Sequence, residues 1–387
     1  TTTLNGGTVA LIGNSGSYAI NYLVASSGTV RLAYSNTVGR NLTLNNLSGS
    51  ANFIINTDLA AGAADTIIVS GGTSTNTLQV AYDPAYLTGQ RITGSATFAT
   101  VSGGSARFTA AASEYGAYSY TPTITSSTSG TATTWTITQL AAASGASETV
   151  YTSTDTIAAN LLLWRTENNN LTKRMGDLRT ASGEAGVWVR TYRGAQEIAN
   201  SGSRATKQQY TALQGGYDRK ISRNDSSLFT GYAIGYLEGS NTYNRGNGEA
   251  SSFTAGVYGS WLGNKGHFLD VIAKVGKLRN SYTNHLNNPT NTKVDGSYSN
   301  WGTSLSAEYG YHKQLKQNWY LEPQAELTYS RINGANYSAS DGTRLRNDAA
   351  NSFTGRLGVA IGRETGQTHY YGKVSLVREF SADAAVS

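Results

Sequence analysis

The chain has 387 residues, a net charge of +6, 44 glycines, 25 tyrosines and no cysteine. Without cysteine, neither a disulfide framework nor a thiolate metal site can form. The Lys and Arg side chains are scattered singly, not gathered into a stripe with stacking aromatics, so we expect no nucleic-acid binding. No stretch of 18 consecutive apolar residues is present, which argues against a transmembrane helix.

Residues 1–140 contain short apolar alternations that are separated by polar, Gly-rich turns. Examples are "GTVRLAYS", "NLTLNNL", "ANFIINTDL" and "DTIIVSGG". Their irregular spacing, near 20 residues at best, predicts the last coils of a parallel β-helix or a related stacked sheet. From "ATFATVSGG" onward the pattern becomes antiparallel, which indicates a module that covers the last open edge of the solenoid.

The middle of the chain contains the strongest helical signal. Residues 141–155 are rich in Ala, Ser and Thr and are interpreted as a linker. Residues 156–182 are predicted to hold a helix and a junction, because no Gly or Pro occurs between Thr156 and Gly176. An asparagine run at 168–170 weakens the helix propensity, so the segment needs its surroundings to hold it in shape.

After Gly183 the apolar pattern has a period of two. In "GHFLDVIAKVGKLRN", the apolar side chains Leu269, Val271 and others fall on one face, while Asp270 and Lys274 fall on the other. Nine such stretches occur before the chain ends. Residues 183–387 are therefore predicted to form a sheet of antiparallel strands.

Alternation alone does not distinguish a soluble sandwich from a membrane barrel. The stretches are long enough to cross a bilayer at a tilt, and they carry ionisable groups in mid-strand. Small residues on the polar face would leave space in a lumen; they are Gly231, Ala233, Gly235 and Gly256. These observations favour an all-β chain that ends in a transmembrane barrel with a polar interior.

The segment "LTKRMGDLRTASGEAGVWVR", followed by "ALQGGYDRKI", resembles the translocator junction of the autotransporter (type V secretion) family. The stretch around residues 98–136 is similar to that family's autochaperone region. The resemblance implies a β-helix end, then a helix in the lumen of an outer-membrane barrel of about twelve strands. With nine strand candidates and no terminal aromatic-ended strand after Phe380, we expect a fragment that lacks about three strands and most of its passenger.

The resemblance also implies location and partners. The barrel is expected in the outer membrane of the cell, and the passenger at the cell surface or secreted. Expected partners are outer-membrane lipid, the barrel assembly machinery and the chain's own passenger, with the barrel monomeric. No cofactor and no metal are expected.

One subgroup of the family, which includes the enterobacterial serine protease autotransporters, cuts itself between two asparagines of an Asn-Asn-Leu sequence. The matching residues are Asn169, whose side-chain amide would attack its own carbonyl, and Asn170, which would become a new N-terminus. The acids matching those that face the pore in that subgroup are Asp270, Glu308 and Glu326. The reaction would be a single-turnover self-cleavage.

The sequence is also compatible with functions other than self-cleavage. The inward acids could instead pair with Lys173, Arg174 and Arg179, which would make the helix a plug and the protein a surface adhesin with an uncleaved passenger. A porin or a barrel enzyme is disfavoured, because neither needs a lumen helix preceded by a solenoid. "GNSGS" at 13–17 resembles a serine protease loop, but a triad needs a histidine and all four histidines follow residue 260.

Overall fold

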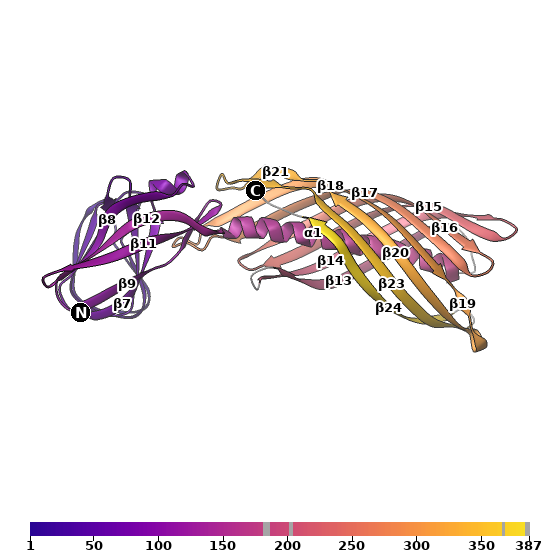
Figure 1. Cartoon of the computed structure of the whole chain (residues 1–387), viewed down its shortest axis with the longest axis horizontal. Helices are drawn as coiled ribbons and strands as arrows, with labels where there is room; N and C mark the ends of the chain where they lie inside the picture. Colours follow the sequence, from indigo (N-terminus) through magenta and orange to yellow (C-terminus); the bar gives the residue numbers. More distant parts are fainter. Residues whose placement is uncertain (181–185, 201–203, 366–367, 384–387) are drawn as a thin grey trace. The chain divides into compact units, whose positions relative to one another are not determined.

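In the computed structural model the chain forms two compact units (Figure 1). The structure describes all residues except 181–185, 201–203, 366–367 and 384–387. The first unit comprises Thr1–Tyr151 with His285–Val294, and the second comprises Thr152–Asn284 with Asp295–Ser387. Among the described residues, no helix combines the length and the apolar character that a membrane span requires.

The first unit is a β-solenoid. Its strands are β1 (Thr2–Ala10), β2 (Gly16–Arg31), β3 (Arg40–Gly49), β4 (Asn52–Asp58), β5 (Ala63–Ala64), β6 (Thr66–Val69), β7 (Thr73–Tyr82), β8 (Ile92–Val101) and β9 (Ser105–Ala110), with the short helix η1 (Pro84–Leu87) between β7 and β8. These strands stack in parallel, except for the short β5, which pairs antiparallel with β4. The "GNSGS" segment forms the turn between β1 and β2, where Gly13 and Gly16 have φ of 129° and 141°. These are left-handed values that favour glycine, so the segment is a solenoid turn.

Successive coils bury one apolar stripe inside the solenoid. Asn41 lies beside Thr66, and Asn52 beside Thr77, so a coil takes 25 residues here, more than the spacing near 20 expected from the sequence. The sequence spacing was misleading because turns of different length separate the strands. Phe53 is fully buried and makes an edge-to-face contact with Phe108, at 5.9 Å between ring centroids.

Three antiparallel strands close the end of the solenoid. They are β10 (Ser113–Tyr115), β11 (Tyr118–Ser129) and β12 (Ala132–Ala146). Strand β12 pairs antiparallel with β8, which itself stacks in parallel on β6, so the edge of β8 is covered, as predicted for the end of the solenoid.

The predicted linker at 141–155 is wrong. Strand β12 continues to Ala146, because Ala146 still lies beside Tyr118 of β11. Helix α1 (Glu148–Thr180) then begins eight residues before the expected Thr156. Between them, Ser147 donates its hydroxyl to the Gly116 carbonyl at 2.6 Å and accepts the first helical hydrogen bond from the Tyr151 amide. Ser147 therefore ends the strand and starts the helix without a flexible spacer.

The second unit is an antiparallel sheet in which each long strand pairs with the next along the chain. Among the described residues nine long strands form this meander, as predicted: β13 (Val187–Asn200), β14 (Arg204–Ser222), β15 (Ser226–Tyr243), β16 (Gly246–Gly263), β17 (His267–His285), β18 (Lys293–Tyr311), β20 (Trp319–Ile332), β23 (Ala350–Thr365) and β24 (Thr368–Asp383). Short elements lie between them: β19 (Lys313–Gln314), η3 (Lys316–Asn318), and a hairpin of β21 (Ala335–Ser338) and β22 (Arg344–Asn347).

This sheet has a polar inner face and an apolar outer face. Asp270 and Glu308 are 1% and 2% exposed, whereas their neighbours Val271 and Tyr309 are 40% and 51% exposed. A soluble sandwich would bury the apolar face instead. Polar side chains therefore face inward and apolar side chains face outward, as expected for the wall of a membrane barrel.

Helix α1 lies along the inner face of the sheet (Figure 1). Its Trp164 is fully buried, and glycines on the strands make room for the indole ring. A Cβ added at Gly276 or Gly302 would come within 3.0 Å of that ring. A Cβ at Gly256, one of the positions expected to leave lumen space, would lie 3.6 Å from Leu171. The small inner residues thus provide the space that the helix occupies.

Candidate functional site in the barrel lumen

The asparagine run lies within regular helix, and its three members have different surroundings. Asn168 is buried, and its side-chain oxygen accepts a hydrogen bond from the Ser304 hydroxyl of β18 at 3.1 Å. Asn170 is also buried, and its backbone carbonyl accepts a hydrogen bond from Nη1 of Arg190 at 2.7 Å. Asn169, the predicted nucleophile, has an exposed side chain.

The three predicted acids do lie on the inner face. Asp270, Glu308 and Glu326 are 1%, 2% and 7% exposed. Arg179, near the end of α1, bonds to Asp270 and lies 3.5 Å from Glu308. Arg356 of β23 bonds to both Glu308 and Glu326. The structure therefore brings the acids together around two arginines.

This acidic group is separated from the asparagine run along the helix axis. Arg179 follows Asn169 by ten residues, which corresponds to about 15 Å of helical rise. A fourth acid, Glu322, has Oε1 at 3.3 Å from Nη2 of Arg179. Its other oxygen, Oε2, lies 2.8 Å from Nδ1 of His312, which donates the hydrogen bond when that nitrogen carries a proton. In this arrangement the carboxylates neutralise cations at the C-terminal end of α1.

A second ionic contact holds the middle of the helix. Nζ of Lys274 in β17 lies 3.4 Å from Oε2 of Glu167 and donates to the Trp164 carbonyl at 3.2 Å. The same ammonium group is 3.6 Å from the centroid of the Trp164 ring. The charged side chains of Lys274 and Glu167 are both almost fully buried, so each charge offsets the cost of burying the other. We call Lys274, Glu167 and Trp164 the lysine clamp.

A third contact lies between these two levels. Arg174 of α1 binds Asp218 of β14 through Nε and Nη2, at 3.0 and 2.7 Å. The Tyr258 hydroxyl donates to the same carboxylate at 3.0 Å and accepts from the Trp188 indole at 2.9 Å. This network is fully connected, which makes it a stable way to hold a charge inside the sheet.

Hydroxyl groups and one ion pair, between Asp155 and Arg204 of β14 at 3.1 Å, hold the N-terminal half of α1. The Ser153 hydroxyl is 2.6 Å from that of Tyr337 in β21 and donates to Asn347 of β22 at 3.0 Å. Thr156 donates to the Tyr243 hydroxyl at 2.9 Å. Helix α1 is therefore held along its length, by hydroxyl groups and the Asp155–Arg204 ion pair toward its beginning and by further ion pairs toward its end.

Several of these partners were not identified from the sequence. Arg356, Arg190 and Asp218 fall on the inner face, and the period-two pattern of their strands contained that information. The pattern did not show which helical residue each would meet, because that depends on how the helix is placed against the sheet.

Comparisons with known proteins agree with this architecture. A family model described as the autotransporter β-domain matches residues 187–387. A second family model, described as pertactin, matches residues 6–139. The two matches cover the strands of the second unit and the solenoid of the first.

Individual proteins show the same similarity. The chain is 30% identical over 336 residues to the BrkA autotransporter of Bordetella pertussis, which is 84% of this chain and 32% of that protein. It is 34% identical over 261 residues to the serine protease EspC of Escherichia coli O127:H6, which is 66% of this chain and 19% of that protein. The chain thus spans a third or less of the length of these two relatives.

A solved structure supports the fold. The translocator domain of the autotransporter NalP from Neisseria meningitidis aligns with a TM-score of 0.51 and 13% identity, covering 62% of this chain and 83% of that one. At this level of identity the likeness concerns the fold alone.

Proposed function

The chain belongs to the autotransporter family, and we propose that its second unit exports the chain's own N-terminal passenger across the outer membrane. The barrel is an outer-membrane domain, and the first unit is the end of a β-solenoid passenger. The observation that supports export best is the inverted wall: charged and polar side chains face α1, while apolar side chains face outward. Such a lumen can accommodate a polar polypeptide, and such an outer face can contact lipid.

After export, helix α1 remains in the lumen as a plug that keeps the passenger attached. The support for this role is the set of contacts that hold the helix, above all the lysine clamp and the Arg179 group. An attached passenger corresponds to a surface adhesin. The geometry favours this function over release, because the lumen carboxylates are bonded to arginines.

The plug can be tested by opening the lysine clamp in the full-length protein. Lys274→Met leaves Glu167 buried without its cation, which costs about 3–5 kcal/mol in comparable buried pairs. We expect the helix to loosen and the ion conductance of the barrel in a planar bilayer to rise. The double variant Lys274→Met with Glu167→Gln should recover most of the closed state.

The matched control for the clamp is Lys277→Met, which removes a lysine from the exposed face of the same strand. It should leave conductance unchanged. Equal conductance in the wild-type protein, the Lys274→Met variant and the control would contradict the plug.

As a second function we propose release of the passenger by self-cleavage between Asn169 and Asn170. The amide nitrogen of Asn169 attacks its own backbone carbonyl carbon, and the bond to the Asn170 nitrogen breaks. The amide proton passes to the leaving nitrogen, and a succinimide remains at the end of the passenger. Support comes from the position of the asparagine run against the inner face of the sheet. Asp270, Glu308 and Glu326 lie on the same face nearer the C-terminal end of α1, so proton transfer by them requires the helix to shift along its axis until Asn169 reaches them.

Intact mass of the barrel after assembly in the outer membrane tests release. Asn169→Ala should abolish it, and Asp270→Asn or Glu308→Gln should slow it by roughly 10²–10⁴-fold, the usual contribution of proton transfer. Asn280→Ala, which removes a buried asparagine from a neighbouring strand, is the control. A barrel beginning at Asn170 supports the assignment, one beginning at Asn169 moves the nucleophile to Asn168, and a single uncut species leaves the helix as a plug.

We further propose that the barrel assembly machinery inserts this domain and that the barrel acts as a monomer. Depletion of that machinery should leave the passenger inaccessible to protease added outside the cell. Crosslinking in the membrane should give a single-copy species, and a dimer would contradict the monomer.

A further inference from the structure

The register of five neighbouring strands divides the outer face into rows. Two rows are apolar throughout and are formed by residues that lie side by side on β13 to β17. One consists of Val187, Tyr217, Tyr232, Val257 and Ala273, and the next of Val189, Gly215, Ile234, Ala255 and Val275. These rows are the surface that lipid chains would contact.

Further along the same strands, the outward positions become polar. The strands extend beyond the hydrocarbon layer of the membrane, because they have up to 19 residues and a bilayer crossing takes roughly 9–11. One polar row is Arg193, Thr211, Glu238, Ser251 and Arg279. The next is Ala195, Gln209, Ser240, Glu249 and Ser281.

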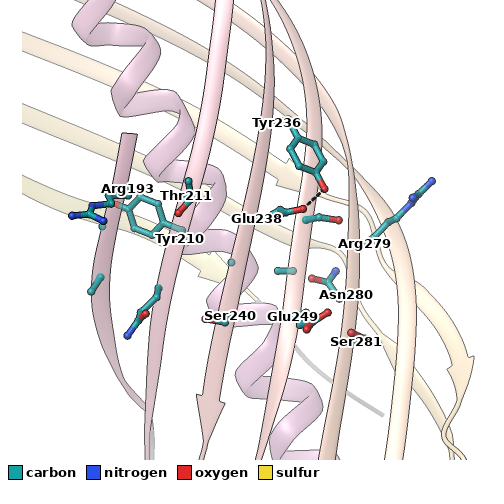
Figure 2. A pocket seen from close by; sticks show the side chains of 16 residues that line it. Arg193, Tyr210, Thr211, Tyr236, Glu238, Ser240, Glu249, Arg279, Asn280 and Ser281 are labelled. Carbon is teal, nitrogen blue, oxygen red and sulfur yellow. Dashed lines mark hydrogen bonds between the residues drawn. The ribbon is translucent and has the colours of Figure 1, made fainter. Parts of the chain in front are cut away.

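The two polar rows line a groove of about 1040 Å³ (Figure 2). Figure 2 shows Arg193 and Arg279 at its opposite ends, with Thr211, Glu238 and Ser240 between them. Tyr236, at the margin toward the apolar rows, donates its hydroxyl to Glu238 at 2.7 Å. We call this feature the outer groove.

The outer groove lies at the level of the N-terminal half of α1. A Cβ at Gly239, which adjoins Glu238, would be 3.2 Å from Leu163 in α1. On β14, Gln208 donates to the Ala159 carbonyl at 3.2 Å, so both strands meet the N-terminal half of the helix at this level. Since the helix N-terminus is the end that continues into the passenger, the groove faces the outer leaflet. This step rests on the proposed function.

We propose that the outer groove binds the phosphorylated sugar headgroup of an outer-leaflet glycolipid. Arginine is the side chain best suited to phosphate, because its guanidinium group can donate two parallel hydrogen bonds. Arg193 and Arg279 are four strands apart, about 19 Å between their backbones, and their long side chains can reach two phosphates on one headgroup.

The side chains between the arginines suit a sugar. Hydroxyl and amide groups of Thr211, Gln209 and Ser240 can both donate and accept hydrogen bonds, and Glu238 and Glu249 can accept from sugar hydroxyls. Two carboxylates would disfavour a ligand made only of phosphate, but they match one in which phosphates flank hydroxyl groups. A mixed row of Thr191, Leu213, Tyr236, Phe253 and Lys277 lies between the groove and the apolar rows, and the apolar rows would carry the acyl chains.

Binding can be measured by native mass spectrometry on the full-length protein. The probes are a bisphosphorylated diglucosamine glycolipid, its monophosphorylated form, phosphatidylglycerol and inorganic pyrophosphate. We expect the bisphosphorylated lipid to bind best and affinity to fall about tenfold for each arginine removed in Arg193→Gln and Arg279→Gln. Arg219→Gln, an exposed outward arginine on the opposite side of the apolar rows, should change nothing.

Equal binding by wild-type protein and the double arginine variant would overturn the proposal. So would equal binding of phosphatidylglycerol, or full displacement of the glycolipid by pyrophosphate, because each would indicate an unspecific or a small-anion site. If the double variant does not assemble, weaker binding of the monophosphorylated lipid to wild-type protein remains the expected result and equal binding overturns the proposal. Heat-modifiable migration of each variant reports barrel assembly separately, so failure of export and failure of lipid binding can be told apart.

Discussion

The two units use the same extended chain with opposite arrangements of side chains. In the first unit, Phe53, Leu44 and their neighbours are fully buried in one apolar cluster. In the second, Val257 and Tyr309 are 61% and 51% exposed, while Lys274 and Asp270 are buried. The difference follows from the surroundings: a solenoid in water gains stability by burying apolar area, whereas a barrel in lipid has no such gain between its parts.

The lumen of the second unit depends on charges to hold the helix. Since the apolar side chains of the second unit point outward, few are left to hold the helix. The small apolar clusters around Trp164 and Met175 are supplemented by ion pairs and hydroxyl networks. The first unit also has buried polar contacts, such as the ion pair between Arg40 and Asp65 at 3.7 Å, but one large apolar cluster forms its core.

The largest expected effect is loss of the solenoid core. Phe53→Ala should destabilise the first unit by about 3–5 kcal/mol, because a fully buried ring is replaced by a cavity. Trp135 is the only tryptophan in residues 1–151, so fluorotryptophan NMR during denaturant unfolding reports this unit separately. Tyr22→Ala, at a position that is 54% exposed, should shift the midpoint little. Equal shifts for the two variants would mean that the first unit lacks an ordered core.

A charge on the outer face of the barrel gives the next largest effect. Val257→Lys places an ammonium group within an apolar row, which should cost about 2–4 kcal/mol in a bilayer. Ser297→Lys, at an exposed outward position, should change stability by less than about 0.5 kcal/mol. Guanidinium unfolding in lipid vesicles measures both. If Val257→Lys were as mild as the control, this face would not contact lipid.

The smallest effect concerns the tyrosines in the solenoid cap. Tyr86 and Tyr120 stack with centroids 4.3 Å apart, and burial raises the pKa of Tyr120 to about 12 from 10.0. Because the folded protein holds this proton more tightly, the associated stability is complete below pH 10 and is lost as the pH rises through about 12. The loss should amount to roughly 3 kcal/mol at most.

The tyrosinate absorbance and the Trp135 signal, followed together against pH, test this. Unfolding of the first unit should accompany ionisation of Tyr120, and Tyr120→Phe should remove that step. Ionisation near pH 10 in a unit that stays folded would show that Tyr120 is accessible to water.

Much of this fold could be predicted from the sequence, because local periodicity reports which face of a strand is buried. The inward positions of Asp270, Glu308 and Glu326 followed from alternation alone. The same pattern failed in the Ala- and Ser-rich stretch before Ser147, where β12 continues only because β11 pairs with it. The hairpin of β21 and β22 had no apolar period and is held instead by contacts such as Tyr337 with Ser153.

The arrangement of the candidate site was less predictable. Alternation places the acids inside but does not fix the axial position of the helix. That position is set by packing between residues far apart in the chain, such as Trp164 against Gly276 and Gly302. It decides that Arg179, and not Asn169, meets Asp270 and Glu308.

The inverted wall of the second unit is tested most directly by site-directed fluorescence in lipid vesicles that contain a quencher in the acyl chains. A fluorophore is attached through cysteine at paired neighbouring positions: Asp270 and Val271, Glu308 and Tyr309, Glu326 and Leu327. We predict strong quenching at Val271, Tyr309 and Leu327 and weak quenching at the three acids. Quenching of the acid positions with protection of their neighbours would contradict the barrel and the export function proposed for it.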